Sequence, residues 1–340
     1  MTRPGGDEKI MVGDLSRRDF LIRLGYASAL ALAAGGLGWA LHDPHGPPPA
    51  ESPKALTGLG DFTRPGAGSE GARMAIVRGT DRALMLERGI KALGGMEAFI
   101  QKGDRVLLKV NAAFATPPSL GATTHPEVLA SIARRCFEAG AARVVVTDNP
   151  INNPESCFEI SGLAHAARTT GAELILPRPA LFSPLSLPAG RLIQKWPVMA
   201  GVFQGITKVM ILSPVKDHQR ARASMSLKNL YGFLGGKRNI FHQDINAIIT
   251  ELAQMLRPTL WVLDGTVTMM TNGPTGGSLD DLKQTNTMVL STDPVAADAV
   301  GLELLGRSPA EVPYLAMAQA AGAGQADYRK LNPVRLDTLT

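Results

Sequence analysis

The stretch of sequence that decides the fold reads Arg105-Val-Leu-Leu-Lys-Val-Asn111. Its apolar residues follow one another without the alternation of a strand that has one face in water. The pattern therefore predicts a strand buried on both faces. Strands of this kind belong to parallel sheets that helices cover on both sides.

Short apolar runs on either side of this stretch alternate with amphipathic segments. Further strands are predicted at 74–77, 144–146, 173–176, 208–212, 260–263 and 288–290. Helices are predicted at 81–94, 124–139, 163–170, 227–233, 245–256 and 293–306. Strands and helices that alternate at this spacing indicate an α/β fold. We therefore predict a single domain with a mostly parallel sheet and helices on both faces.

Several local expectations rest on turn and cap chemistry. Thr124 and Glu127 form a capping-box pattern, which predicts Thr124 as the N-cap of a helix. Lys216, Asp217 and His218 are expected to follow the strand 208–212 after a short turn, and Asp264 to close the strand 260–263. The proline-rich segment 177–197 is typical of a loop or a short β excursion.

The N-terminal segment has the pattern of an export signal. Residues 16–22 read Ser-Arg-Arg-Asp-Phe-Leu-Ile, and an uncharged run follows from Leu24 to Leu41. A charged start, paired arginines and a mild apolar run are typical of a twin-arginine signal. We expect residues 1–42 to be this signal, 43–70 a Pro- and Gly-rich linker, and 71–340 the folded domain.

Resemblance to such signals implies that the folded protein is exported with the twin-arginine (Tat) translocase as its partner. A periplasmic or other extracytoplasmic location follows from that route. The apolar run of about 18 residues also reaches the short end of a membrane span. An uncleaved signal that anchors the protein in the membrane is therefore the alternative.

Charge and cysteine content narrow the classes of ligand. The formal net charge is +5, which suits an anionic ligand or a membrane surface. The Lys and Arg residues form no continuous block, which argues against nucleic-acid binding. The two cysteines, Cys136 and Cys157, are too few for an iron–sulfur cluster or a four-thiolate zinc site. Cys136 falls within a predicted helix, so two buried thiols are favoured over a disulfide, which stays open. No particular cofactor is indicated.

Polar residues follow several predicted strands at the point where each strand ends. In open α/β sheets ligands bind at the carboxyl ends of the strands, so these residues are expected to converge on one rim. The candidates are Lys109, Asn111, Asp148, Lys216, His218, Asp264, Asn272 and Gly273. These residues also have structural interpretations: for example, Asp148-Asn-Pro150 and Asp264-Gly265 are turn sequences. The Gly-rich loop at 272–277 matches neither the P-loop nor the dinucleotide fingerprint.

The histidines have competing interpretations. His125 lies in the first turn of a predicted helix, where the dipole disfavours its protonated form, so its neutral ring can bind a metal or accept a proton. His218 stands in a dense polar run, whereas the spacing of His242 to Ile245 and Ile249 favours a buried structural histidine. A mononuclear metal site stays open. The motifs of the known serine hydrolases and zinc proteases do not occur.

A series of motifs along residues 74–306 occurs in the order of a known family. They are Lys109-Val-Asn111, Ala122-Thr-Thr-His-Pro-Glu127, Ala139-Gly-Ala-Ala-Arg-Val144 running to Asp148-Asn-Pro150, Ser226-Leu-Lys-Asn-Leu-Tyr-Gly232, His242, Asp264-Gly265 with Asn272-Gly-Pro274, and Asp293-Pro-Val-Ala-Ala-Asp298. On these motifs the chain resembles the DUF362 family, bacterial and archaeal α/β proteins whose function is largely undefined.

Some positions depart from that family's pattern. Val110 stands where a proline is usual, and Asp217 stands where a threonine is common. Some relatives carry a ferredoxin-like domain with clustered cysteines, which this sequence does not contain, so an electron-transfer role stays open.

The resemblance adds Lys228 and Asn229 to the expected ligand-binding residues. Lys109, Lys216 and Lys228 would neutralise an anionic ligand, His125 or His218 would transfer a proton or bind a metal, and Asp264 would orient a lysine or a metal-bound water. The expected function is an exported protein of undefined activity that binds an anionic ligand, metal or cofactor at the rim. Whether it is an enzyme stays open, with a cofactor-dependent, redox-linked oxidoreductase or an isomerase as the enzyme interpretations. The alternative is a non-catalytic accessory or maturation protein for an exported redox system.

Overall fold

The computed structural model describes residues 16–40, 55–63 and 72–339, and the chain divides into two units, Met1–Pro53 and Lys54–Thr340. Each unit is described by itself. The expected linker residues 43–54 and 64–70, and the signal residues 1–15, 41 and 42, lie outside the described residues.

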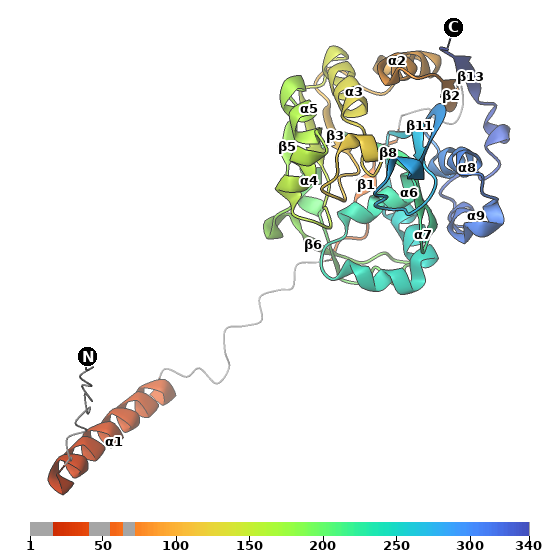
Figure 1. The fold of residues 1–340 in the computed structure, drawn as a ribbon. Helices are drawn as coiled ribbons and strands as arrows, with labels where there is room; N and C mark the ends of the chain where they lie inside the picture. The colour runs from red at the N-terminus through yellow and green to blue at the C-terminus, as the bar shows by residue number, and fades with distance from the viewer. Residues whose placement is uncertain (1–15, 41–54, 64–71, 340) are drawn as a thin grey trace, which may run out of the picture. The chain divides into compact units, whose positions relative to one another are not determined.

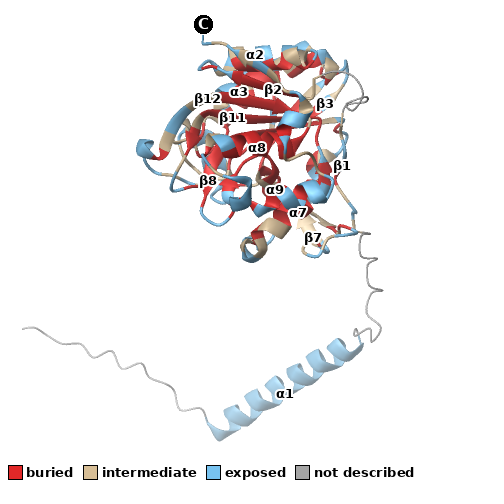
Figure 2. Ribbon diagram, turned by 90° about the vertical axis from the view of Figure 1, so that its right-hand side faces the viewer, coloured by how far each residue is buried: buried red, intermediate tan, exposed pale blue. Residues whose placement is uncertain are grey.

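The described part of the first unit is one helix, α1 (Arg17–Ala40). Ser16 caps it, because its Oγ accepts the N–H of Asp19 at 3.2 Å. The helix is exposed along its whole length (Figure 2). At about 1.5 Å per residue it is longer than a hydrocarbon core of about 30 Å. By length and composition α1 can cross a membrane, a test that a signal sequence also passes.

A mostly parallel sheet forms the centre of the second unit (Figure 1). Within the described residues its nine strands are β2 (Met74–Arg78), β3 (Arg105–Lys109), β4 (Arg143–Thr147), β5 (Glu173–Ile175), β8 (Lys208–His218), β9 (Arg222–Ser224), β11 (Leu260–Met269), β12 (Leu282–Ser291) and β13 (Val334–Asp337). Eight of them run in the order β13-β2-β12-β11-β8-β3-β4-β5, and β9 pairs with β8. β12 is antiparallel to both of its neighbours, and β9 is antiparallel to β8. The predicted sheet is confirmed.

Helices cover both faces of this sheet. They are α2 (Arg82–Ala92), α3 (Pro126–Glu138), α4 (Pro154–Ile160), α5 (Leu163–Thr170), α6 (Ser226–Asn229), α7 (Ile245–Met255), α8 (Pro294–Leu304) and α9 (Pro313–Ala320). Figure 2 shows α2 and α3 on one side of the strands and α7, α8 and α9 on the other. Val106 and Leu108 of β3 pack toward the first layer and Leu107 toward the second. The single α/β domain is therefore a three-layer structure.

Part of the predicted linker is packed onto the domain. β1 (Gly60–Asp61) pairs in parallel with β10 (Leu256–Arg257), and Leu59 is buried. The prediction of a linker was therefore wrong for residues 55–63, because Leu59 is buried and Gly60–Asp61 pair with β10. The predicted β excursion at 177–197 is present as an antiparallel pair, β6 (Ser183–Leu185) and β7 (Trp196–Val198).

Two strands run further than predicted. β8 continues through Lys216 to His218, where Lys216 pairs with Ser224 of β9, and β11 continues past Asp264 to Met269. The predicted turn before Lys216 and the predicted strand end at Asp264 were therefore wrong. Polar residues remain in these strands because their side chains have partners elsewhere in the fold: Lys216 donates to Asn111, and Asp264 accepts from Arg82.

The N-cap of α3 also differs from the prediction. His125 caps the helix, with its Nδ1 accepting the N–H of Glu127 at 3.4 Å. Thr124 is instead bound into the sheet, because its Oγ1 donates to the carbonyl of Leu212 at 2.8 Å and accepts the N–H of Asn111 at 2.7 Å. Tertiary partners of the threonine hydroxyl thus replace the local capping box.

The two cysteines are buried in the layer that contains α3 and α4. Cys136 lies on α3 and Cys157 on α4, and both are free thiols. Burial raises the pKa of the Cys136 thiol to about 12, so this thiol stays protonated at neutral pH.

Candidate functional site

Two neighbouring parallel strands place a buried ion pair at the carboxyl rim of the sheet. Nζ of Lys109, at the end of β3, lies 2.8 Å from Oδ1 of Asp148, which follows β4. Asp148 also accepts the N–H groups of Ala112 at 2.6 Å and Asn149 at 2.8 Å. Burial lowers the pKa of Lys109, and the carboxylate acts in the opposite direction. The charge of Asp148 is therefore already compensated by a lysine of the protein.

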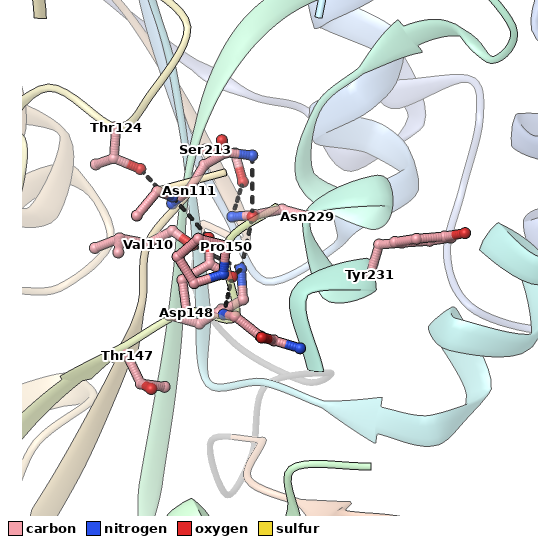
Figure 3. Close-up of polar contacts among 12 residues, drawn as sticks. Val110, Asn111, Thr124, Thr147, Asp148, Pro150, Ser213, Asn229 and Tyr231 are labelled. Atoms are coloured by element: carbon pink, nitrogen blue, oxygen red, sulfur yellow. Dashed lines mark hydrogen bonds and ion pairs between the residues drawn. The ribbon is translucent and has the colours of Figure 1, made fainter. Parts of the chain in front are cut away.

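Asn229, the last residue of α6, connects this ion pair to the neighbouring strand. Its Oδ1 accepts from Nζ of Lys109 at 2.8 Å and from Nδ2 of Asn111 at 3.3 Å. Its Nδ2 donates to the carbonyl of Leu212 at 3.1 Å and to Oγ of Ser213 at 2.9 Å. Figure 3 shows Asn229 between Ser213 and Asn111, with Tyr231 directed away from this network.

Lys216 enters the same network from β8, and no carboxylate of the described residues forms an ion pair with it. Its Nζ donates to Oδ1 of Asn111 at 3.2 Å and to the carbonyl of Ala122, and it lies 5.3 Å from the ring centroid of Phe114. Burial, and next the charge of Lys228, lower the pKa of Lys216 to about 7. Among the described residues, the hydrogen-bond acceptors of this Nζ are neutral oxygens.

Lys228 is the least constrained of the three lysines. Its Nζ lies 5.3 Å from the ring centroid of Tyr231, and within the described part of the chain the structure gives it no hydrogen bond or ion pair. Burial, and next the charge of Arg238, lower its pKa to about 7. A cation and a neutral amine are therefore present in similar amounts near pH 7.

The short helix α6 is positioned from the opposite layer. The buried carboxylate of Asp298, on α8, accepts the N–H of Ser226 at 2.8 Å and that of Leu227 at 3.2 Å. A carboxylate at the first N–H groups of a helix acts as an N-cap does. Gly232 follows α6, and a Cβ at this position would lie 2.0 Å from Oδ1 of Asp148. Only glycine lets this backbone approach the ion pair so closely.

Two histidines stand beside Lys228 and carry their protons on different nitrogens. Nδ1 of His218 accepts the N–H groups of Arg220 at 3.2 Å and Ala221 at 3.1 Å. The proton of its neutral ring is therefore assigned to Nε2. Burial, followed by the charge of Lys228, lowers the pKa of His218 to about 2. His218 is thus a neutral hydrogen-bond donor.

His242 is assigned the opposite tautomer. The hydroxyl of Tyr231 donates to the carbonyl of Arg238, and Nδ1 of His242 lies 3.2 Å from the carbonyl of Asn239 and 3.3 Å from that hydroxyl. Nδ1 must therefore be the donor, which leaves a lone pair on Nε2. Burial and the charge of Lys228 lower the pKa of His242. The two rings are stacked, with centroids 5.9 Å apart.

These side chains line a narrow inner cavity and the wider cleft outside it. The inner cavity has a volume of about 100 Å³, and the outer cleft about 780 Å³. Both are lined by Asn149, Ile151, Tyr231, Arg238 and His242, so the two spaces adjoin. The charged residues that line the inner cavity are Asp148, Lys216, Lys228 and Arg238.

The structure brings most of the predicted site residues together. Those at the rim are Lys109, Asn111, Asp148, Lys216, His218, Lys228 and Asn229, each at the inner cavity or hydrogen-bonded to a residue that lines it. Three further residues were missed: Tyr231, Arg238 and His242. Tyr231 and His242 lie within motifs that carry the family resemblance, and this was the signal that could have found them.

Asp264 and His125 lie in a different cluster. Oδ2 of Asp264 lies 2.9 Å from Nε of Arg82, the first residue of α2, and its Oδ1 accepts the N–H of Thr266. The predicted role of Asp264 in orienting a lysine was therefore wrong, because its partner is Arg82, and its alternative role in orienting a metal-bound water stays a prediction. His125 is beside this pair, and burial, followed by the charge of Arg82, lowers its pKa. Neither residue lines the inner cavity.

The loop with Asn272 and Gly273 is bound to other parts of the protein. Nδ2 of Asn272 donates to Oδ1 of Asp281 at 2.6 Å, and the N–H of Gly273 donates to Oδ2 of Asp217 at 2.9 Å. Pro274 is the residue of this turn that lines the inner cavity. The described residues contain no group of three or more His, Cys, Asp or Glu side chains that could hold a metal ion.

The fold and the site define an α/β protein with a cation-lined cavity at the carboxyl rim of a mostly parallel sheet. The chain belongs to the family described as a domain of unknown function, DUF362, whose model matches residues 106–303. It is 28% identical over 242 residues to a thylakoid-associated protein of Synechocystis, covering 68% of this chain and 73% of that protein.

A crystal structure of a Thermotoga maritima protein is also similar, at 11% sequence identity over 70% of this chain. This chain covers 58% of that protein, and the TM-score is 0.34, which is too low to establish a shared fold.

Proposed function

We propose that this protein binds a small organic anion, with a carboxylate or phosphate group, in the inner cavity. The observation that carries the proposal is the uncompensated charge of Lys216 and Lys228. Asp148 is the carboxylate of the inner cavity, and it is bound to Lys109. An anionic ligand would supply the missing counter-charge, and charge-assisted hydrogen bonds from an ammonium are stronger than neutral ones.

The adjoining cleft supports an organic ligand rather than a bare ion. A cavity of about 100 Å³ has room for one anionic group and little more. The outer cleft is lined in part by apolar side chains, among them Pro177, Pro179, Phe182 and Pro197. We infer that the anionic group occupies the inner cavity and that an apolar part of the ligand extends into the cleft.

The N-terminal helix supports an extracytoplasmic location. α1 begins at the Arg17–Arg18 pair and is long and apolar enough to cross a membrane, and a relative is thylakoid-associated. We propose that the protein is exported by the twin-arginine route, with α1 as its signal or anchor. Replacing both arginines by lysine should keep the protein in the cytoplasmic fraction, whereas unchanged export would contradict this route.

Calorimetric titration of the full chain with inorganic phosphate, sulfate and acetate tests the binding proposal. Mild detergent keeps the apolar helix α1 in solution. Lys216→Met and Lys228→Met should each weaken binding by about ten- to a hundredfold, because each removes a hydrogen bond to a charged group. Lys330→Met is the matched control, since Lys330 is exposed and does not line the cavity. Thermal unfolding of each variant verifies that it is folded.

Equal binding by the wild type, Lys216→Met and Lys228→Met would refute the proposed site. The absence of binding of all three anions to the wild type would refute the proposed function.

A further inference from the structure

The three lysines at the rim have different partners, and this difference separates their roles. Lys109 is paired with Asp148, and Lys216 is hydrogen-bonded to Asn111 and Ala122. Lys228 has a cavity in front of it and no hydrogen-bonding partner among the described residues. An amine without such a partner can act as a nucleophile, in addition to attracting an anion as a cation.

We propose that Nζ of Lys228 is a nucleophile that forms an imine with the carbonyl group of a small anionic aldehyde or ketone, such as an oxo acid, bound in the inner cavity. This rests on the proposed function in one respect: Lys216 holds the anionic group of the same molecule. The reaction class is condensation of an amine with a carbonyl compound.

The surroundings of Lys228 favour a neutral amine at physiological pH. The titratable or charged groups that line the cavity with it are Asp148, Lys216, His218, Tyr231, Arg238 and His242. Burial, and next the charge of Arg238, oppose the ammonium form of Lys228, whose pKa is lowered to about 7. About half of the side chain is therefore unprotonated near pH 7, against less than about one part in a thousand for an ordinary lysine.

The opposite tautomers of the two histidines suit the two proton requirements of this reaction. His218 presents Nε2–H, which can donate to a carbonyl oxygen and polarise it as a neutral electrophile. His242 has a lone pair on Nε2, which can take a proton from the attacking nitrogen. The charge of Lys228 affects the pKa of both rings, so the three groups are electrostatic neighbours.

The step balances without an oxidant or reductant. The lone pair of Nζ forms a bond to the carbonyl carbon, and the carbonyl π pair moves to oxygen. His242 transfers one amine proton from the nitrogen to that oxygen, which gives a carbinolamine. The nitrogen lone pair then forms the C=N bond, and the oxygen leaves as water with the second amine proton. One amine and one carbonyl compound give one imine and one water.

Trapping with glyoxylate and cyanoborohydride tests the proposal on the full chain. Reduction of the imine converts a reacted lysine to N-carboxymethyl-lysine, which peptide mass spectrometry assigns to a site. Lys228 should react at least about tenfold faster than the exposed Lys330 at pH 7, because its neutral fraction is larger by on the order of a thousandfold and its lower basicity offsets part of this gain. Its rate should pass through a maximum near pH 7, because attack needs neutral Lys228 and binding of the anionic group needs protonated Lys216, whereas the rate at Lys330 keeps rising.

A conservative variant separates this proposal from the anion-binding function. Lys228→Arg keeps a cation in the cavity and lacks a nucleophilic amine, so it should still bind sulfate and yield no adduct at this position. Sulfate should also protect Lys228 in the wild type. Modification of Lys228 no faster than that of Lys330, or fastest at Lys216, would overturn the imine proposal while sulfate binding stands. Absence of binding of phosphate, sulfate and acetate to the wild type would overturn the proposed function itself.

Discussion

The buried ion pair between Lys109 and Asp148 gives the sharpest prediction for stability. Asp148→Asn keeps the size of the side chain and removes its charge. Nζ of Lys109 then retains the carbonyl of Val110 at 2.6 Å and Oδ1 of Asn229 at 2.8 Å, but no anion. Removal of one partner of a buried pair costs about 3–5 kcal/mol. For a domain of this size the expected fall in Tm is roughly 6–20 °C.

Thermal and urea unfolding of the full chain measure this effect. The matched control is Glu159→Gln, which breaks an exposed pair with Arg168 whose side chains are 57% and 65% accessible. The control should change stability by less than about 1 kcal/mol. The double variant Lys109→Met with Asp148→Asn should recover part of the loss, because it removes the uncompensated buried charge. Asp148→Asn as stable as the control would refute the reasoning.

Two further predictions concern the same cavity. Gly232→Ala places a Cβ 2.0 Å from Oδ1 of Asp148 and should lower the free energy of unfolding by about 1–3 kcal/mol by overpacking. The control is Gly277→Ala, where a Cβ meets no atom within 4 Å, and it should unfold like the wild type. Equal melting temperatures of the two variants would contradict this prediction. A bound anion raises the pKa values of Lys216 and Lys228 from about 7, so sulfate affinity should be greatest below pH 7. Above pH 7 the affinity should fall by up to about tenfold per pH unit for each lysine. An affinity that calorimetry finds constant from about pH 6 to pH 9 would contradict this coupling.

Elements fixed by local chemistry were predictable from the sequence. The continuous apolar run at 105–110 indicated burial on both faces, and β3 has that position in the sheet. Asp81 and Asp293, the first residues of the predicted helices 81–94 and 293–306, cap α2 and α8, because each carboxylate accepts an N–H three residues ahead. Lys109 and Asp148 were predicted to lie on the same rim, because the carboxyl ends of parallel strands share one rim.

Features that depend on distant partners were not predictable in this way. Lys216 and Asp264 resembled residues beyond strand ends, yet both lie inside strands. Their partners, Asn111 and Arg82, are 105 and 182 residues away in sequence. Tyr231, Arg238 and His242 come from 3-10 segments rather than from strand ends, so the rule that ligands bind at the carboxyl ends of strands did not place them at the cavity.

The sequence by itself determined the layered α/β class, the strand that carries Lys109, and an excess of cationic residues without a basic block. These depend on apolar periodicity, local caps and composition, which are properties of short segments. The tertiary structure alone decided which lysine has a counter-ion. Asp148 reaches Lys109, and neither Lys216 nor Lys228 has a carboxylate at hydrogen-bonding distance among the described residues. Only the fold sets the distance and the burial that govern the pairing of charges.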